Sequence, residues 1–337
     1  MNRIISAHAT PAVPAGKPEV ARLLVDADSE GQRLDNFLLR HLKGVPKTHV
    51  YRIIRSGEVR LNKGRTSADT RVQAGDVVRV PPVRVAQRPL DERPAPARES
   101  PILLEDEQLI AVDKPAGVAV HGGSGVSFGV IEQLRQARQY GQPGGLRLLE
   151  LVHRLDRETS GILLLAKKRS ALKYLQDQFR ERATGKTYLA LVLGDWPAAR
   201  KVIDAPLHKY LLADGERRVK VVAAGDPDGM RAITLVKVRE RLAGFTLLEV
   251  TIKTGRTHQI RVHLAASGHP IAGDPKYGDF TLNKHLARER RFERMFLHAR
   301  ELAFDHPASG ERITLQSPLP MECAALCATL APPPPAP

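Results

Sequence analysis

The chain has 337 residues, with 52 Lys and Arg against 37 Asp and Glu and a formal net charge of +15. Hydrophobic residues make up 42% of it, which is typical of a globular protein and too many for a disordered one. With Cys323 and Cys327 as its only cysteines, and no apolar run near the ~18 residues that span a bilayer, the sequence excludes a disulfide scaffold and a membrane protein. Its length predicts two domains, and its composition predicts a cytoplasmic location.

The N-terminal segment, residues 1–20, has no apolar core of the kind that secretory signals carry. We predict a disordered leader there. Positive charge concentrates soon after it, because residues 31–93 hold 14 Lys and Arg against 6 Asp and Glu, an excess of 8. Such asymmetry indicates a polyanionic partner, and nucleic acid before a membrane surface.

Residues 21–82 show the pattern of a small α/β domain. Leu34, Phe37, Leu38 and Leu42 follow helical spacing, and Val50, Ile53 and Ile54 continue it in a second short helix. Ser56-Gly57 ends that helix, Asn62-Lys63-Gly64 is a turn signal, and residues 77–80 form a strand.

Three stretches of this region resemble the S4 RNA-binding domain over about residues 22–82. They are Arg33-Leu34-Asp35, the run from Tyr51 to Gly57, and Val59-Arg60-Leu61-Asn62. The resemblance implies an RNA-binding surface, and the clustered cations are its candidate contacts: Lys47, Arg52, Arg55, Arg60 and Lys63. A basic helical hairpin that only packs on the next domain is the alternative.

Residues 83–101 are predicted to be a linker. Pro81 to Pro101 includes six prolines, and proline fixes φ and removes a backbone donor. The chain ends in a Pro-rich run, so we expect a disordered tail over residues 326–337, and a second domain over residues 102–325.

This second domain is predicted to be an α+β fold on a mixed, largely antiparallel sheet. Seven short β-branched or aliphatic runs suggest strands, at residues 110–112, 148–152, 162–166, 188–193, 233–238, 245–252 and 259–264. Two helical patterns interrupt them, one around Ile131 and Leu134 and one around Leu172 and Leu175. A basic run from Lys284 to Arg294 suggests a further helix.

Gly125-Val126-Ser127-Phe128-Gly129 fits the G-x-S-x-G pattern of serine hydrolases. That chemistry needs a strand before the turn, and a glycine cluster precedes this one. We expect Ser127 to cap a helix that begins near Phe128. No metal site is predicted, because zinc-type spacings are absent and His258 and His263 would face opposite sides of one strand.

The segment from His153 to Gly161 joins two apolar strands and places Asp156 between them. Arg154 and Arg157 flank this carboxylate and are expected to keep it ionised. Thr159-Ser160-Gly161 supplies turn hydrogen bonds and a residue that tolerates positive φ. An exposed turn with an ion pair would look the same from these residues alone.

His153-Arg154-Leu155-Asp156-x-x-Thr159-Ser160-Gly161 resembles the signature of the RluA-type pseudouridine synthases. Four further segments agree with that family in order: residues 113–117 with His121, 186–190, 254–263 and 296–299. Together with residues 121–132 and the S4-like region, they resemble most closely the large-ribosomal-subunit pseudouridine synthase C group.

The resemblance implies isomerisation of uridine to pseudouridine in large-subunit (23S) ribosomal RNA, with base flipping, no cofactor and a monomeric enzyme. By family position, Asp156 is the catalytic carboxylate, Arg261 its cation partner and Tyr188 the ring that stacks on uracil. Arg154 would fill the space of the flipped base, Arg256 would bind a phosphate, and Leu297 would form an apolar wall. A non-catalytic RNA-binding or ribosome-assembly protein on the same fold is the alternative.

Overall fold

The computed structural model describes residues 20–26, 29–42, 45–83, 95–122, 128–142, 145–146, 148–213 and 216–331. The chain divides into two compact units, Met1–Arg93 and Pro94–Pro337. This division falls inside the predicted linker. The leader up to residue 19 and linker residues 84–94 lie outside the described residues, so both stay predictions.

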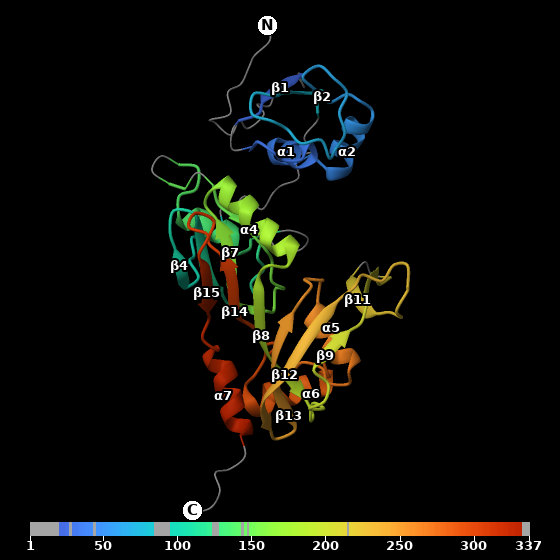
Figure 1. The fold of residues 1–337 in the computed structure, drawn as a ribbon, viewed down its shortest axis with the longest axis vertical. Helices are drawn as coiled ribbons and strands as arrows, with labels where there is room; N and C mark the ends of the chain where they lie inside the picture. The colour runs from blue at the N-terminus through green and yellow to red at the C-terminus, as the bar shows by residue number, and fades with distance from the viewer. Residues whose placement is uncertain are drawn as a thin grey trace, which may run out of the picture. The chain divides into compact units, whose positions relative to one another are not determined.

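The N-terminal unit is a three-stranded antiparallel sheet with two helices (Figure 1). Its elements are β1 (Ala21–Leu24), α1 (Leu34–His41), α2 (Lys47–Arg55), β2 (Arg60–Leu61) and β3 (Val77–Val80), and the strand order is β1-β3-β2. The apolar residues that predicted the helices, such as Phe37 and Ile53, are buried in one core. Strand β1 was not predicted, because its four residues include no β-branched side chain, whereas β3 contains three valines.

Two predicted turn signals of this unit are confirmed. Helix α2 ends at Arg55 with Ser56 as its C-cap, and Gly57 follows with a φ of 75°. Asn62 and Lys63 have φ values of 47° and 71°, so the reversal after β2 uses two residues in the left-handed region.

The C-terminal unit is built on a ten-stranded mixed sheet with the order β4-β5-β7-β14-β8-β13-β12-β9, where β15 pairs with β14 and β6 with β7. Only β7 and β14 pair in parallel among its described strands. The predicted mixed, largely antiparallel sheet is therefore confirmed. The strands are β4 (Ile102–Glu105), β5 (Leu109–Lys114), β6 (Glu150–Leu151), β7 (Ser160–Ala166), β8 (Gly185–Leu193), β9 (Val202–Asp204), β12 (Ile233–Leu242), β13 (Phe245–Ile252), β14 (Leu297–Asp305) and β15 (Arg312–Gln316).

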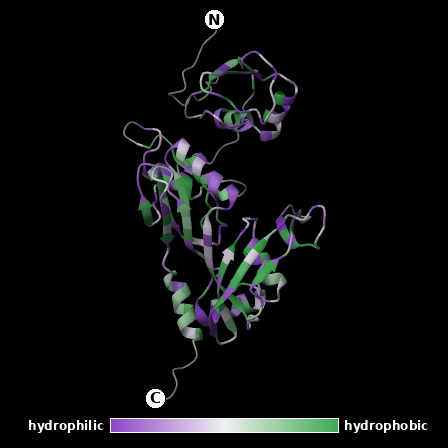
Figure 2. Ribbon diagram, viewed as in Figure 1, coloured by the Kyte–Doolittle hydropathy of each residue, from purple (hydrophilic) through white to green (hydrophobic). Residues whose placement is uncertain are grey.

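A separate antiparallel hairpin of β10 (Leu207–Leu211) and β11 (Arg217–Val221) stands beside the sheet (Figure 1). Five helices complete the unit: α3 (Val130–Ala137), α4 (Arg169–Glu181), α5 (Gln259–Ala266), α6 (Phe280–Arg290) and α7 (Met321–Leu330). Hydrophobic residues follow the sheet strands (Figure 2). The residues of α4 pack with one face of β5 and β7, and those of α3 with the other.

The predicted strand at residues 259–264 is wrong, because these residues form most of helix α5. All six are buried, so the helix has no polar face that would reveal its period of 3.6 residues. Its polar side chains are instead paired inside the protein; His263, for example, contacts Thr234 Oγ1 and Ala205 O. His258 and His263 therefore do not lie on opposite sides of a strand, because His258 precedes α5 and His263 lies within it.

Three other boundaries are corrected. Helix α7 continues to Leu330, and its Leu326 and Leu330 are buried, so residues 326–330 are not a disordered tail; residues 332–337 lie outside the described residues. Helix α6 ends at Arg290, before the end of the basic run. Helix α3 begins at Val130 and not near Phe128, and Glu132 Oε2 accepts the N–H of Gly129 at 2.8 Å. Ser127 lies outside the described residues, so its capping role stays a prediction.

Candidate active site

The loop between β6 and β7 holds Asp156. The backbone carbonyl of Asp156 accepts a hydrogen bond from Thr159 N at 3.1 Å, and this bond closes a turn just before β7. Gly161 has a φ of 110°, and a Cβ there would lie 2.3 Å from Ala299 O on β14. Only glycine fits where the two parallel strands meet, so the predicted positive-φ residue of this motif is confirmed.

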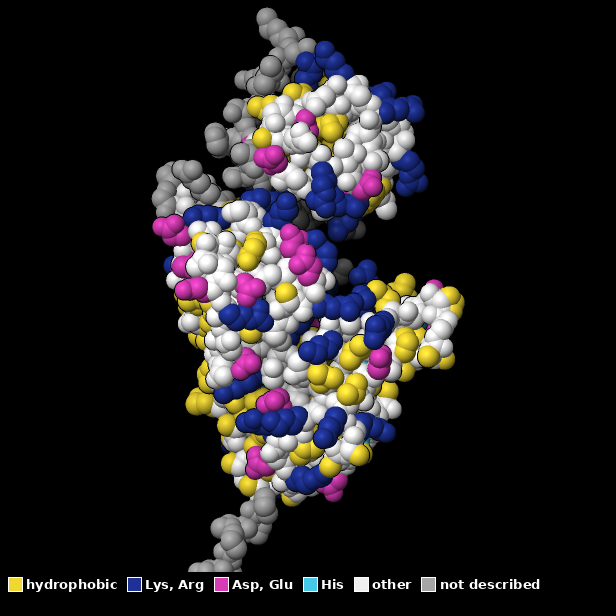
Figure 3. Space-filling model, viewed as in Figure 1, with side chains coloured by type: hydrophobic (Ala, Val, Ile, Leu, Met, Phe, Trp, Pro, Cys, Tyr) yellow, Lys and Arg dark blue, Asp and Glu magenta, His cyan; other side chains and the backbone are white. Residues whose placement is uncertain are grey.

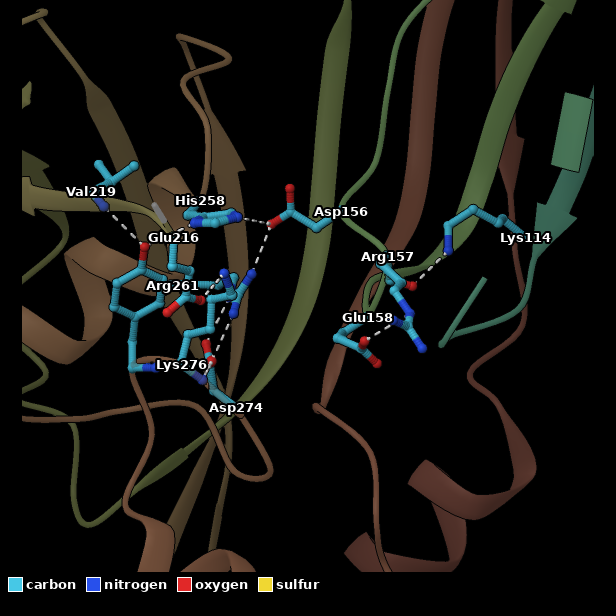
Figure 4. A network of polar contacts seen from close by, with 11 residues as sticks. Lys114, Asp156, Arg157, Glu158, Glu216, Val219, His258, Arg261, Asp274 and Lys276 are labelled. Atoms are coloured by element: carbon cyan, nitrogen blue, oxygen red, sulfur yellow. Dashed lines mark hydrogen bonds and ion pairs between the residues drawn. The ribbon is translucent and has the colours of Figure 1, made fainter. Parts of the chain in front are cut away.

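The Asp156 side chain faces His258 and Arg261 (Figure 4). Arg261 Nη1 lies 3.2 Å from Oδ2, and His258 Nε2 lies 3.8 Å from the same oxygen. Within the described part of the chain, Oδ1 has no hydrogen-bond partner. One carboxylate oxygen is thus held by the protein, and the other is available to a ligand.

Arg261 is shared between two carboxylates. Its Nε and Nη2 donate to Asp274 Oδ2 and Oδ1, both at 2.8 Å, while Nη1 reaches Asp156. Burial alone would lower the pKa of Arg261, but the hydrogen bonds and negative charge of Asp274, together with Asp156, raise it overall. Burial would raise the pKa of Asp274, and Arg261 instead holds it below its usual value. The guanidinium is therefore a permanent, oriented charge beside Asp156.

The Thr254-x-Arg256-x-x-Gln259 spacing locks the start of α5. Gln259 Oε1 accepts from Thr254 Oγ1 at 2.7 Å and from Arg256 N at 3.1 Å, and its Nε2 donates to Ile233 O at 2.9 Å. His258 precedes the helix with a φ of 53°, in the left-handed region. These contacts fix the backbone that carries His258 and Arg261, both of which face Asp156.

A pocket of about 230 Å³ opens beside Asp156 and is lined by Tyr188, Ile252 and Leu297 among others. A neighbouring hollow of about 370 Å³ shares Asp156, Arg154 and Arg261 with it. Burial, and then the charge of Asp156, raises the pKa of Tyr188, so its hydroxyl stays protonated. Among the described residues that hydroxyl has no hydrogen-bond partner. The site thus offers a carboxylate beside an aromatic ring and an apolar wall.

The pocket is also lined by His153, Phe179 and Lys186. His153 stacks on Phe179 with ring centroids 4.7 Å apart, and Lys186 Nζ lies 5.3 Å from the Phe179 centroid. Burial lowers the pKa of His153 to about 4 and also lowers that of Lys186. His153 Nε2 accepts the N–H of Leu164 at 3.1 Å, so this histidine is a neutral structural acceptor.

The structure brings together all six residues expected here, namely Arg154, Asp156, Tyr188, Arg256, Arg261 and Leu297, because each lines the pocket. The cation that contacts Asp156 is Arg261, as the family position implied, and not one of the flanking arginines. Arg157 turns away, to Gly117 O at 3.0 Å and to Glu158 at 3.5 Å, and Arg154 is exposed without an ion pair among the described residues. Arg256 Nε donates to Arg231 O at 3.2 Å.

The five cations expected to bind RNA lie on α2, on β2 and in the turn after it, in the N-terminal unit. Four of them, Lys47, Arg52, Arg55 and Lys63, are exposed, and Arg60 is half-buried. None forms an ion pair with a described residue. Lys and Arg side chains are visible over this unit and over the C-terminal unit (Figure 3).

Sequence reasoning missed Asp274 and Tyr277, which complete the surroundings of Arg261 and His258. Tyr277 Oη lies 2.8 Å from His258 Nδ1, and its ring centroid is 5.1 Å from the Arg261 guanidinium. Both residues belong to the short segment from Gly273 to Gly278, and the signal available was an acidic residue in a turn between two glycines.

The described residues contain no group of three or more His, Cys, Asp or Glu side chains arranged to hold a metal ion. No described helix combines the length and apolar character needed to cross a membrane.

Comparison with known proteins decides the family. The model for RNA pseudouridylate synthases matches residues 108–266, and the model for the S4 domain matches residues 32–78. A protein of Escherichia coli K12 named ribosomal large subunit pseudouridine synthase C is 50% identical over 309 residues, which cover 90% of this chain and 94% of the relative. The chain belongs to the RNA pseudouridylate synthase family.

Other members of the family agree. The Yersinia pestis protein of the same name is 50% identical over 90% of this chain and 93% of its own. The solved structure of human RNA pseudouridylate synthase domain containing 4 superposes with a TM-score of 0.55 and 28% identity, covering 68% of this chain and 92% of the human one. These comparisons favour an RNA pseudouridine synthase over the non-catalytic alternative and confirm the S4-like N-terminal region.

Proposed function

We propose that this pseudouridine synthase isomerises specific uridines of large-subunit ribosomal RNA and that Asp156 is its catalytic carboxylate. The observation that carries the proposal is the position of Asp156, with one oxygen held by Arg261 at 3.2 Å and the other free at a pocket that Tyr188 and Leu297 line. The names of the bacterial relatives, which specify the large ribosomal subunit, support this class of RNA.

The reaction breaks the N1–C1′ bond, turns the uracil and joins C5 to C1′; C5 then loses its hydrogen as a proton and N1 gains one, so the change is redox-neutral and needs no cofactor. Asp156 acts as a carboxylate in each of the three roles open to it. These are attack on C1′, attack on the base and removal of the 2′ proton. Arg261 stabilises this negative charge, and Asp274 keeps the guanidinium in place with two hydrogen bonds of 2.8 Å.

A stacked uridine cannot reach this pocket, so the enzyme must first flip it out at a cost of a few kcal/mol. Arg154 is exposed at the pocket edge and free to occupy the vacated space. Tyr188 then provides a ring for the uracil, Leu297 an apolar wall and Arg256 a cation for a phosphate. The exposed cations of the N-terminal unit hold the surrounding RNA. We propose that the enzyme works as a monomer in the cytoplasm.

The test is tritium release from ribosomal RNA that contains 5-tritiated uridine. We expect Asp156→Asn to abolish release while the affinity for RNA stays within about threefold, because the substitution removes the carboxylate and little contact area. Glu158→Gln is the matched control in the same loop and should remain active. Turnover by Asp156→Asn would rule out the catalytic assignment.

The substrate is tested by mapping pseudouridines in ribosomal RNA from cells with and without the gene. We expect particular sites of the large-subunit RNA to lose the modification when the gene is deleted. Unchanged large-subunit RNA would contradict the proposed substrate without bearing on the role of Asp156.

A further inference from the structure

The β10–β11 hairpin lies next to the segment from Gly273 to Gly278. Glu216 forms an ion pair with Lys276, and Arg218 Nη1 donates to Lys276 O at 2.5 Å. The Arg218 guanidinium also lies 5.7 Å from the Tyr277 ring centroid. The seating of the hairpin therefore depends on contacts with this segment.

Tyr277 is the point where the hairpin meets the active site. Its hydroxyl oxygen accepts the backbone N–H of Val219, on β11, at 3.1 Å. The same oxygen lies 2.8 Å from His258 Nδ1. Because Val219 N–H can only donate, the hydroxyl hydrogen of Tyr277 is free to point at His258.

The direction of the hydrogen bond between Tyr277 Oη and His258 Nδ1 determines the tautomer of His258. If Tyr277 donates to Nδ1, a neutral imidazole carries its hydrogen on Nε2, the nitrogen 3.8 Å from Asp156 Oδ2. The charged groups around this ring are Asp156, Arg261, Lys276 and Asp274. Burial lowers the pKa of His258, which favours the neutral ring. A neutral ring with the opposite tautomer would present a lone pair to the carboxylate.

We propose that Tyr277 and His258 form a relay that couples the seating of the β10–β11 hairpin to the orientation of the Asp156 carboxylate. His258 Nε2–H and Arg261 Nη1–H both face Oδ2 and so keep Oδ1 for the substrate. Tyr277 is a positioning residue that acts through His258. The inference rests on the proposed function of Asp156.

The first test is steady-state kinetics of tritium release by the full-length enzyme. We expect Tyr277→Phe to lower kcat about tenfold, the effect of one missing hydrogen bond, while KM stays within about twofold. Tyr210→Phe, on the same hairpin, is the matched control and should keep the wild-type kcat. A wild-type kcat in Tyr277→Phe would overturn the relay.

The second test separates the relay from a loss of packing. Glutamine places an amide N–H near the position of Nε2, and asparagine places one near Nδ1, so His258→Gln should retain much more activity than His258→Asn. In the His258→Gln background, Tyr277→Phe should have no further effect on kcat, because there is no tautomer left to select. Full additivity of the two substitutions would contradict the proposal.

The third test concerns the hairpin. Arg218→Met removes its contacts with Lys276 and Tyr277 and should lower kcat in the wild type but much less in Tyr277→Phe. Arg217→Met, at the exposed neighbouring position, should leave kcat unchanged. An equal loss of kcat from Arg218→Met in both backgrounds would show that the hairpin does not act through Tyr277. If Asp156→Asn is itself active, the catalytic role proposed for Asp156 fails; if it is inactive and Tyr277→Phe is fully active, only the relay fails.

Discussion

At the scale of single residues, the two oxygens of Asp156 have different surroundings. Arg261 and His258 both face Oδ2, at 3.2 and 3.8 Å, and no described residue hydrogen-bonds to Oδ1. The Tyr188 hydroxyl also lacks a partner in the described part of the chain, and its raised pKa keeps it a neutral phenol. The ring and the hydroxyl of Tyr188 could therefore contribute separately to activity.

Substitution of Tyr188 distinguishes these contributions. We expect Tyr188→Ala to reduce kcat/KM about 10- to 100-fold, because stacking of a base on an aromatic ring is worth ~1–3 kcal/mol. Tyr188→Phe keeps the ring and should lose much less. Tyr174→Ala, at an exposed position on α4, serves as the control. Equal losses in Tyr188→Phe and Tyr188→Ala would show that the hydroxyl is the part that matters.

At the scale of elements, α5 and the 273–278 segment form the support of the site. Arg261 and Asp274 side chains are 4% and 1% exposed, so their ion pair is almost fully buried. Removing one partner of such a pair leaves the other charge without compensation in a medium of low dielectric constant. Loss of either partner is therefore expected to destabilise the C-terminal unit as well as to release the orientation of Arg261.

Urea unfolding measures this contribution. Asp274→Asn should lower the free energy of unfolding by about 3–5 kcal/mol, the range for breaking a buried ion pair. The exposed pair of Arg312 and Asp305, 46% and 37% exposed, provides the comparison. Asp305→Asn should change stability by no more than about 1 kcal/mol. Similar losses for the two variants would mean that burial does not determine the strength of the Arg261–Asp274 pair.

At the scale of the whole molecule, the densest positive charge and the chemistry lie in different units. An excess of 8 positive charges falls within residues 31–93, while the pocket and its carboxylate belong to the unit that follows. Phosphate contacts bind RNA without reading its sequence and make the affinity depend on salt. The N-terminal unit is thus expected to contribute affinity, and the C-terminal unit the reaction.

The salt dependence of RNA binding tests this division in the full-length protein. A variant with Lys47, Arg52 and Arg55 all changed to Gln should reduce the slope of log Kd against log salt by about 2–3, near 0.7–0.9 for each phosphate that the protein no longer neutralises. The kcat at saturating RNA should remain within about twofold of the wild type. Lys237→Gln with Arg239→Gln, on β12, is the control. An unchanged slope in the triple variant would remove these cations from the RNA-binding surface.

Much of the fold could be predicted from local patterns. Leu34, Phe37 and Leu38 predicted α1 because a helix with one buried face repeats its apolar residues every three to four positions. Asp156 could be selected because its motif resembles that of a family whose chemistry needs one carboxylate. Gly161 was expected to adopt positive φ, and the close approach of Ala299 explains why.

The sequence by itself therefore determined the family and the elements with one buried face, and it selected Asp156 as the candidate catalytic carboxylate. Only the tertiary structure decided that residues 259–266 form a helix, since a helix buried on every side has no amphipathic pattern. It also showed that the neighbouring Arg157 turns away from Asp156, whereas Arg261, 105 positions away and expected from the family resemblance, contacts it. Neighbours in sequence can point apart on a turn, and residues far apart in the chain meet only when the sheet and helices pack.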